Sequence, residues 1–224
     1  MRVLKIITAR SIWLFPLTDL NPKGKAIDKE LIEWLKKTYQ FQKFPSSAFD
    51  YDNETKTLTF DGGKFKAGYE GGGKERYIGV GLIIYQDGLV ANSASSTTDS
   101  DNFLSEALES ATKELGLVAP ERIRKKLYFS ELDIRLDRPI SLLNPKLENL
   151  AHRISELRTE DPHIAFEFSG VSFLPQPQMQ ATISGFHLER KINTEWSENR
   201  YYTKAPLQTE AHLKLLEEFE VLLV

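Results

Sequence analysis

Apolar residues recur along the chain at spacings that predict alternating strands and helices. Residues 2–8 are rich in Val, Leu and Ile and predict a first strand that continues toward Phe15. A helix is expected after Asp28, which is a suitable N-terminal cap. In that helix one face carries the residues expected to be buried: Leu31, Ile32, Trp34 and Leu35.

Residues 49–95 predict an antiparallel meander. The segment Asp61-Gly62-Gly63 predicts a tight turn, because glycine supplies the positive φ that such turns need. Residues 77–85 predict a strong strand, and Asp87-Gly88 predicts a hairpin after it. The polar run 95–101 then precedes a helix that ends at Gly116, with one apolar face formed by Leu104, Leu108, Ala111 and Leu115.

The second half repeats this pattern in outline. Leu132, Ile134 and Leu136 alternate with charged residues and predict a half-buried strand. Asn144-Pro145 opens a helix, and we expect its buried face to consist of Leu147, Leu150, Ile154 and Leu157. Further strands are expected at 164–168, with a bulge at Gly170, and at 186–192 and 200–203. Pro206 begins a last helix with an inward face of Leu213, Leu216 and Phe219.

These elements predict an α+β protein in which antiparallel β-sheets pack against helices. Each half reads strand, helix, several strands, helix, and both early helices follow the tetrapeptide Leu-Asn-Pro-Lys, at 20–23 and 143–146. A duplicated unit and a chance recurrence are both compatible with this order. The charged segment 118–126 contains Pro120 and is the expected boundary between domains 1–118 and 119–224, unless the two form one continuous domain.

Composition narrows the classes of function. The 224 residues are 41% hydrophobic and 27% charged, as in an ordinary globular protein, with a net charge of -3. No basic stripe is visible, so a nucleic-acid partner is not expected. The chain has no cysteine, which excludes disulfides and thiolate metal sites. Lys5 and Arg10 interrupt the apolar N-terminus, so no secretory signal is expected. No later apolar run approaches ~18 residues, so no membrane helix is expected, and the predicted location is the cytoplasm.

The stretch Gly-Tyr-Glu-Gly-Gly-Gly-Lys-Glu at 68–75 matches the phosphate-loop pattern at every position except the last. Glu75 stands where that loop needs a hydroxyl for magnesium, and a strand follows where the loop needs a helix. We therefore expect a loop between strands and no nucleotide hydrolysis. A weaker alternative is an anion cradle formed by Gly71, Gly72, Gly73, Lys74 and Arg76.

Other candidate chemistry is sparse. The carboxylate pairs Asp50/Asp52 and Asp99/Asp101 have the oxygen ligands that hard cations prefer, but helix capping explains Asp99 and Asp101 equally well. His187 and Glu189 share one face of a strand, as an acid–base pair or as two solvated side chains. No metal-binding or serine-nucleophile motif is present, and no cofactor is expected.

Several aromatic and aliphatic residues are candidates for an interface, because such residues are enriched in binding hot spots. They are Trp13, Phe15, Trp196, Tyr201, Tyr202, Leu222 and Leu223. The tail 221–224 is apolar and predicts either a strand of the chain's own sheet or a contact with a second chain.

The leading hypothesis is a non-catalytic binding or assembly protein that acts through other proteins or through a homodimer. The alternative is a phosphate-ligand protein or metal-dependent hydrolase that uses Lys74, Arg76 and nearby acidic residues.

Overall fold

A computed structural model describes residues 1–20, 29–46, 57–70, 73–118, 120, 123–157, 165–175 and 184–223. The predicted features at 21–24, Asp28, Asp50, Asp52, Gly71 and Gly72 lie outside these ranges. The first half contains β1 (Arg2–Leu14), η1 (Leu17–Leu20), α1 (Lys29–Tyr39), β2 (Thr57–Tyr69), β3 (Glu75–Tyr85), β4 (Gly88–Ser93) and α2 (Thr97–Leu115). The second half contains β5 (Lys125–Arg135), η2 (Ile140–Leu143), α3 (Pro145–Leu157), β6 (Gly170–Phe173), β7 (Phe186–Arg190), η3 (Trp196–Glu198), β8 (Arg200–Ala205) and α4 (Thr209–Val221).

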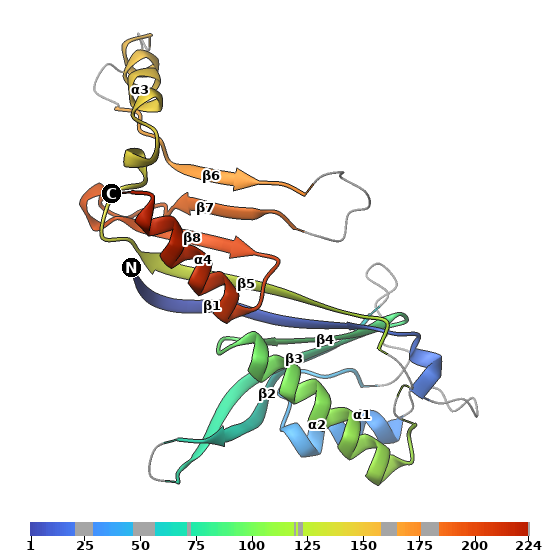
Figure 1. The fold of residues 1–224 in the computed structure, drawn as a ribbon. Helices are drawn as coiled ribbons and strands as arrows, with labels where there is room; N and C mark the ends of the chain where they lie inside the picture. Colours follow the sequence, from blue (N-terminus) through green and yellow to red (C-terminus); the bar gives the residue numbers. More distant parts are fainter. Residues whose placement is uncertain are drawn as a thin grey trace. The chain divides into compact units, whose positions relative to one another are not determined.

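The strands form one antiparallel sheet in the order β2-β3-β4-β1-β5-β8-β7-β6 (Figure 1). The predicted α+β class is therefore confirmed. The order β1-α1-β2-β3-β4-α2 of the first half recurs as β5-α3-β6-β7-β8-α4 in the second. In each half the opening strand also lies beside the last strand, as β1 beside β4 and β5 beside β8.

The chain forms two compact units. Unit 1 consists of Met1–Ile7, Glu131–Pro206 and Glu210–Val224, and unit 2 consists of Thr8–Ser130 and Leu207–Thr209. The predicted domains 1–118 and 119–224 differ from these units at 1–7, 119–130 and 207–209. Whether the halves are independent domains or a true duplication stays a prediction.

In unit 2, α1 and α2 lie side by side against one face of the sheet (Figure 1). The predicted stripe of α1 is buried most deeply at Ile32 and Leu35, with exposures of 1% and 3%. Tyr39 then joins the two helices, because its hydroxyl donates to Glu106 of α2 at 3.1 Å. Both predicted ends of α2 are confirmed. At the N-terminus the Ser96 side chain accepts a hydrogen bond from the Asp99 N–H, and after the C-terminus Gly116 takes a left-handed conformation with φ of 66°.

The predicted turn at Asp61-Gly62-Gly63 is wrong, because β2 continues through it. Phe60 pairs with Leu82 and Gly63 with Val80, so β2 accommodates one extra residue in a bulge. Gly62 has the positive φ of 68° that was expected, but a bulge uses this conformation as well as a turn does. A side chain at Gly63 would overlap the ring of Phe41, with a Cβ only 2.4 Å from it.

In unit 1, α4 packs on the strands through Leu216, which is fully buried with Leu132, Leu188 and Tyr201. Asp133 of β5 was expected on the solvated face but is 2% exposed. Arg200 donates two hydrogen bonds to its carboxylate at 3.0 and 2.7 Å, and Lys191 donates a further one. The hydrogen bonds from Arg200 and Lys191 outweigh burial and hold the pKa of Asp133 below its ordinary value.

Four predictions in the second half are wrong. The described residues 165–169 are not a strand, and Gly170 begins β6 in a continuous register with β7 rather than forming a bulge. The tail is not a strand, since α4 runs to Val221 and a turn follows it. Leu223 in that turn is nevertheless 1% exposed and belongs to the core of unit 1. The fourth is the expected buried face of α3, which is described with the candidate site.

Candidate functional site: the apolar face of helix α3

The glycine-rich stretch connects the hairpin strands β2 and β3. Tyr69 pairs with Glu75, the Glu70 N–H donates to the Lys74 carbonyl at 2.7 Å, and the Gly73 N–H donates to the Glu70 carbonyl at 3.1 Å. Lys74 is exposed. Since a strand and not a helix follows, no helix dipole is directed at this loop.

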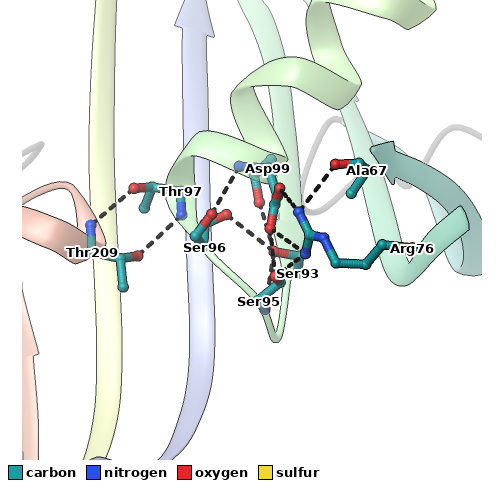
Figure 2. A network of polar contacts seen from close by, with 9 residues as sticks. Ala67, Arg76, Ser93, Ser95, Ser96, Thr97, Asp99 and Thr209 are labelled. Carbon is teal, nitrogen blue, oxygen red and sulfur yellow. Dashed lines mark hydrogen bonds and ion pairs between the residues drawn. The ribbon is translucent and has the colours of Figure 1, made fainter. Parts of the chain in front are cut away.

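Arg76 of the predicted anion cradle binds a carboxylate of the protein itself. Figure 2 shows its guanidinium against Asp99, which it contacts at 2.6 and 3.1 Å, and against the Ala67 carbonyl at 3.1 Å. Burial alone would raise the pKa of Asp99, but the hydrogen bonds from Arg76 and Ser95 outweigh it and lower that pKa. The carboxylate that holds Arg76 would also repel a phosphate, so this geometry does not favour an anion site.

Asp101 faces a different set of groups. Its Oδ1 accepts from Ser11 Oγ at 2.7 Å and from Trp13 Nε1 at 2.6 Å, and its Oδ2 contacts Lys126 Nζ at 2.9 Å. Residues two apart on a helix point to nearly opposite sides. Asp99 and Asp101 therefore do not converge, and within the described ranges no group of three His, Asp or Glu side chains is placed to hold a metal.

The seven interface candidates divide by burial. Trp13, Phe15, Tyr201 and Leu223 are at most 4% exposed and are core residues of their units, not surface anchors. Their large apolar side chains, which suggested an interface, fill the interior instead. Tyr202 is half-buried and donates to Glu131 at 2.6 Å. At the surface lie Leu222 and Trp196, whose ring stacks on the Arg190 guanidinium at 4.2 Å.

His187, which with Glu189 is the candidate acid–base pair, also contacts a serine. His187 Nδ1 lies 2.8 Å from Ser172 Oγ on the adjacent strand β6, at an exposed position. His187 is half-buried and Ser172 is exposed, and a contact of this kind is ordinary for polar side chains at a surface.

The clearest departure from the sequence prediction is on α3. Its apolar residues were expected to be buried, yet Leu150, Ile154 and Leu157 are 56%, 41% and 64% exposed, and Ala151 is the buried residue of this helix. Figure 1 shows α4 lying across the strands of unit 1 and α3 extending away from them. We call the row Leu147, Leu150, Ile154 and Leu157 the α3 strip.

Local interactions explain why α3 forms although its apolar face stays open. Pro145 stands at the first helical position, and the Asn144 side chain accepts from the Lys146 N–H at 3.1 Å. On the anchored side, Ser155 Oγ donates to the Ala151 carbonyl at 3.1 Å and accepts from the Phe166 N–H at 2.9 Å. Ala151 and Ser155 thus lie on the anchored side of the helix, while Leu150, Ile154 and Leu157 of the α3 strip are exposed and Leu147 is half-buried.

The solvent side of the strip is basic. Lys146 precedes Leu150 by four residues, and Arg153 precedes Leu157 by four. Each basic side chain therefore lies next to that leucine on the surface of the helix. Arg153 pairs with Glu156 at 2.7 Å, but both side chains are 63% exposed, so this pair is weak and exchangeable. Phe166, 38% exposed, adds apolar surface beside Ser155.

Comparisons with known proteins supply no function. No known protein family matches the chain, and no curated protein resembles it. Among the helices in the described residues, none has the length and apolar composition needed to cross a membrane.

Proposed function

We propose that this protein is a non-catalytic binding or assembly protein, and that the α3 strip is its contact surface. The observation that carries this proposal is the exposure of three large aliphatic residues on one face of a well-formed helix. Burying one such side chain stabilises a complex by roughly 1.5–3 kcal/mol. A row of them in solvent is typical of a surface that another protein covers.

The spacing of the strip favours a helical partner. Leu147, Leu150, Ile154 and Leu157 are separated by three, four and three residues, which is the a/d pattern of helices that pack side by side. Helix-in-groove recognition uses anchors at these same intervals. The partner is either another protein or a second copy of this chain, as in the predicted homodimer.

The alternative of a phosphate-ligand protein or metal-dependent hydrolase gains no comparable support. It requires Arg76 and an acidic residue around a shared ligand, whereas Arg76 and Asp99 bind each other. The absence of a cofactor and of a nucleic-acid partner, and a location in the cytoplasm, stay predictions.

The test is a pull-down from the native host with three immobilised baits, followed by mass-spectrometric identification. The baits are the wild type, Ile154→Asp, and the control Ile192→Asp, which places the same charge at an isoleucine that is 83% exposed in another part of the second half. We expect one identified protein to bind the wild type and the control but not Ile154→Asp. A partner retained equally by all three baits, or no specific partner, contradicts the proposal.

A further inference from the structure

We infer that the partner of the α3 strip is a second copy of this chain, and that the strip packs on the outer face of that copy's helix α4. This inference rests on the proposed function, because it names the occupant of the same surface. It follows from the pairing of helices in the first half, from a matching pattern on α4, and from complementary charge.

The packing of α1 in the first half indicates what kind of element covers a helix in the position of α3. The helix α1 holds the same place in the order of elements as α3 and packs beside α2. Tyr39 donates to Glu106, its ring meets Phe103 edge-on with centroids 5.0 Å apart, and Trp34 Nε1 donates to Glu114 at 2.9 Å. A helix in this position thus buries its apolar face partly against the helix that ends its half.

In the second half the helix in the place of α2 is α4, and it carries an uncovered apolar row of its own. Leu215 is 38% exposed and Leu222 is 64% exposed. Leu222 lies in the turn that directly follows α4, where its N–H donates to the Phe219 carbonyl at 3.0 Å. We call Leu215, Glu218 and Leu222 the α4 strip.

The α4 strip matches the α3 strip position by position. In α3 the order is Leu150, Arg153, Leu157, and in α4 it is Leu215, Glu218, Leu222. Both have intervals of three and four residues, and the two leucines of α3 lie about 10.5 Å apart along the helix at 1.5 Å per residue. When the leucines of one strip face those of the other in antiparallel helices, Arg153 and Glu218 lie on the same side of the seam, offset by about 1.5 Å along it.

The charge argument rests on the pair Arg153 and Glu218. Lys146 adds a second positive charge beside the α3 strip, whereas the exposed Lys214 lies one turn before Glu218 on α4. Opposite charges at the edge of an apolar seam select the partner and its register. A seam of leucines bordered by Arg153 does not pair as well with its own copy, because the two arginines would then meet.

A second copy fits better than the same chain as the source of α4. Within unit 1 the α3 strip is exposed at Leu150, Ile154 and Leu157, and the α4 strip at Leu215 and Leu222. The chain's own α4 therefore does not cover these residues of its own α3. In a two-fold symmetric dimer each copy donates one α3 and receives one, so all four strips become buried and the assembly closes.

The first experiment measures mass and charge dependence. Light scattering on the purified wild type is expected to give twice the mass of one chain, and Leu150→Asp to give the mass of one chain. Arg153→Glu is expected to weaken the dimer by at least about tenfold, because it brings like charges together. Combining it with Glu218→Arg restores the pair and should recover the wild-type affinity, a result that general damage to the fold does not produce.

The second experiment uses the absence of cysteine from the natural chain. Protein with Arg153→Cys is mixed with protein carrying Glu218→Cys and oxidised, and we expect a disulfide-linked pair of chains on a non-reducing gel. Arg153→Cys mixed with Ile192→Cys is the matched control and should link far less.

The outcomes separate the two proposals. A wild type with the mass of one chain at all concentrations overturns the second-copy inference. A partner captured in an Ile154-dependent manner would then leave the proposed function intact. A dimer that persists in Leu150→Asp, or cross-linking that is equal in the control, also overturns the inference.

Discussion

His212 of α4 is a fully buried ionisable residue in unit 1. Thr203 Oγ1 donates to the His187 carbonyl at 2.8 Å, so its oxygen is left to accept from the His212 Nε2–H at 2.9 Å. This arrangement fits a neutral imidazole protonated at Nε2. Burial accordingly lowers the pKa of His212 from 6.5 to about 4.

Because the folded-state pKa is lowered, His212 should make stability depend on pH in a defined window. Its contribution is complete above the unfolded pKa and is lost as the pH falls from 6.5 toward 4. We expect the free energy of unfolding, measured with urea, to fall by on the order of 3 kcal/mol across this window. His212→Gln supplies an N–H near the same place without titrating, and should remove most of this slope. Equal slopes in both proteins would contradict the assignment.

Variants of Arg76 and Lys74 test whether these residues have a structural role or bind phosphate. Arg76→Met leaves the buried carboxylate of Asp99 without its strongest partner, and we expect unfolding free energy to fall by about 2 kcal/mol. Lys74→Ala changes an exposed residue and should change neither stability nor the affinity for ATP or GTP.

Denaturation and titration calorimetry on both variants check this pair of expectations. Micromolar nucleotide binding to the wild type that Lys74→Ala abolishes would revive the anion-cradle alternative.

At the scale of whole elements, α1 and α3 have similar apolar periodicity and opposite burial. Leu35→Ala in α1 removes a 3% exposed side chain and should cost about 2–4 kcal/mol of unfolding free energy. Leu150→Ala in α3 removes a 56% exposed side chain and should cost less than about 0.5 kcal/mol.

Urea denaturation of dilute protein, in which a dimer is dissociated, measures both effects. Similar losses in the two variants would mean that the chain's own core covers α3 in solution, and would remove the basis of the proposed contact surface.

At the scale of the molecule, Leu223 in the turn after α4 belongs to the core of unit 1. Leu223 is 1% exposed against Leu216 and Phe219, whereas its neighbour Leu222 is 64% exposed. Deleting 221–224 should therefore lower the melting temperature, and Leu223→Ala alone should cost about 2–4 kcal/mol.

The matched variant Leu222→Ala should leave the melting temperature of the dilute protein unchanged but weaken the dimer. Light scattering and thermal melts on these three proteins separate the two effects. An unchanged melting temperature and mass after deletion would show that the tail contributes to neither.

Local signals in the sequence determined most elements, because they depend on residues close together in the chain. The strand periodicity of 77–85, the left-handed Gly116 and the cap-and-proline start at 144–145 each correspond to an observed end or element. The α+β class and the repeated order of elements follow from these signals. The failures at Gly62 and Gly170 have a local cause too, since positive φ serves turns and bulges alike and a glycine can simply begin a strand.

Tertiary structure decided which apolar faces and charges are buried. Periodicity groups Leu150, Ile154 and Leu157 on one side of a helix, but whether anything covers that side depends on where the helix lies. Asp133 is far in sequence from both Arg200 and Lys191, and it meets Arg200 because β5 and β8 are neighbours in the sheet. Arg76 likewise bonds Asp99 because β3 and the start of α2 lie close together. Such contacts depend on strand order, which is a property of the folded chain and not of any single segment.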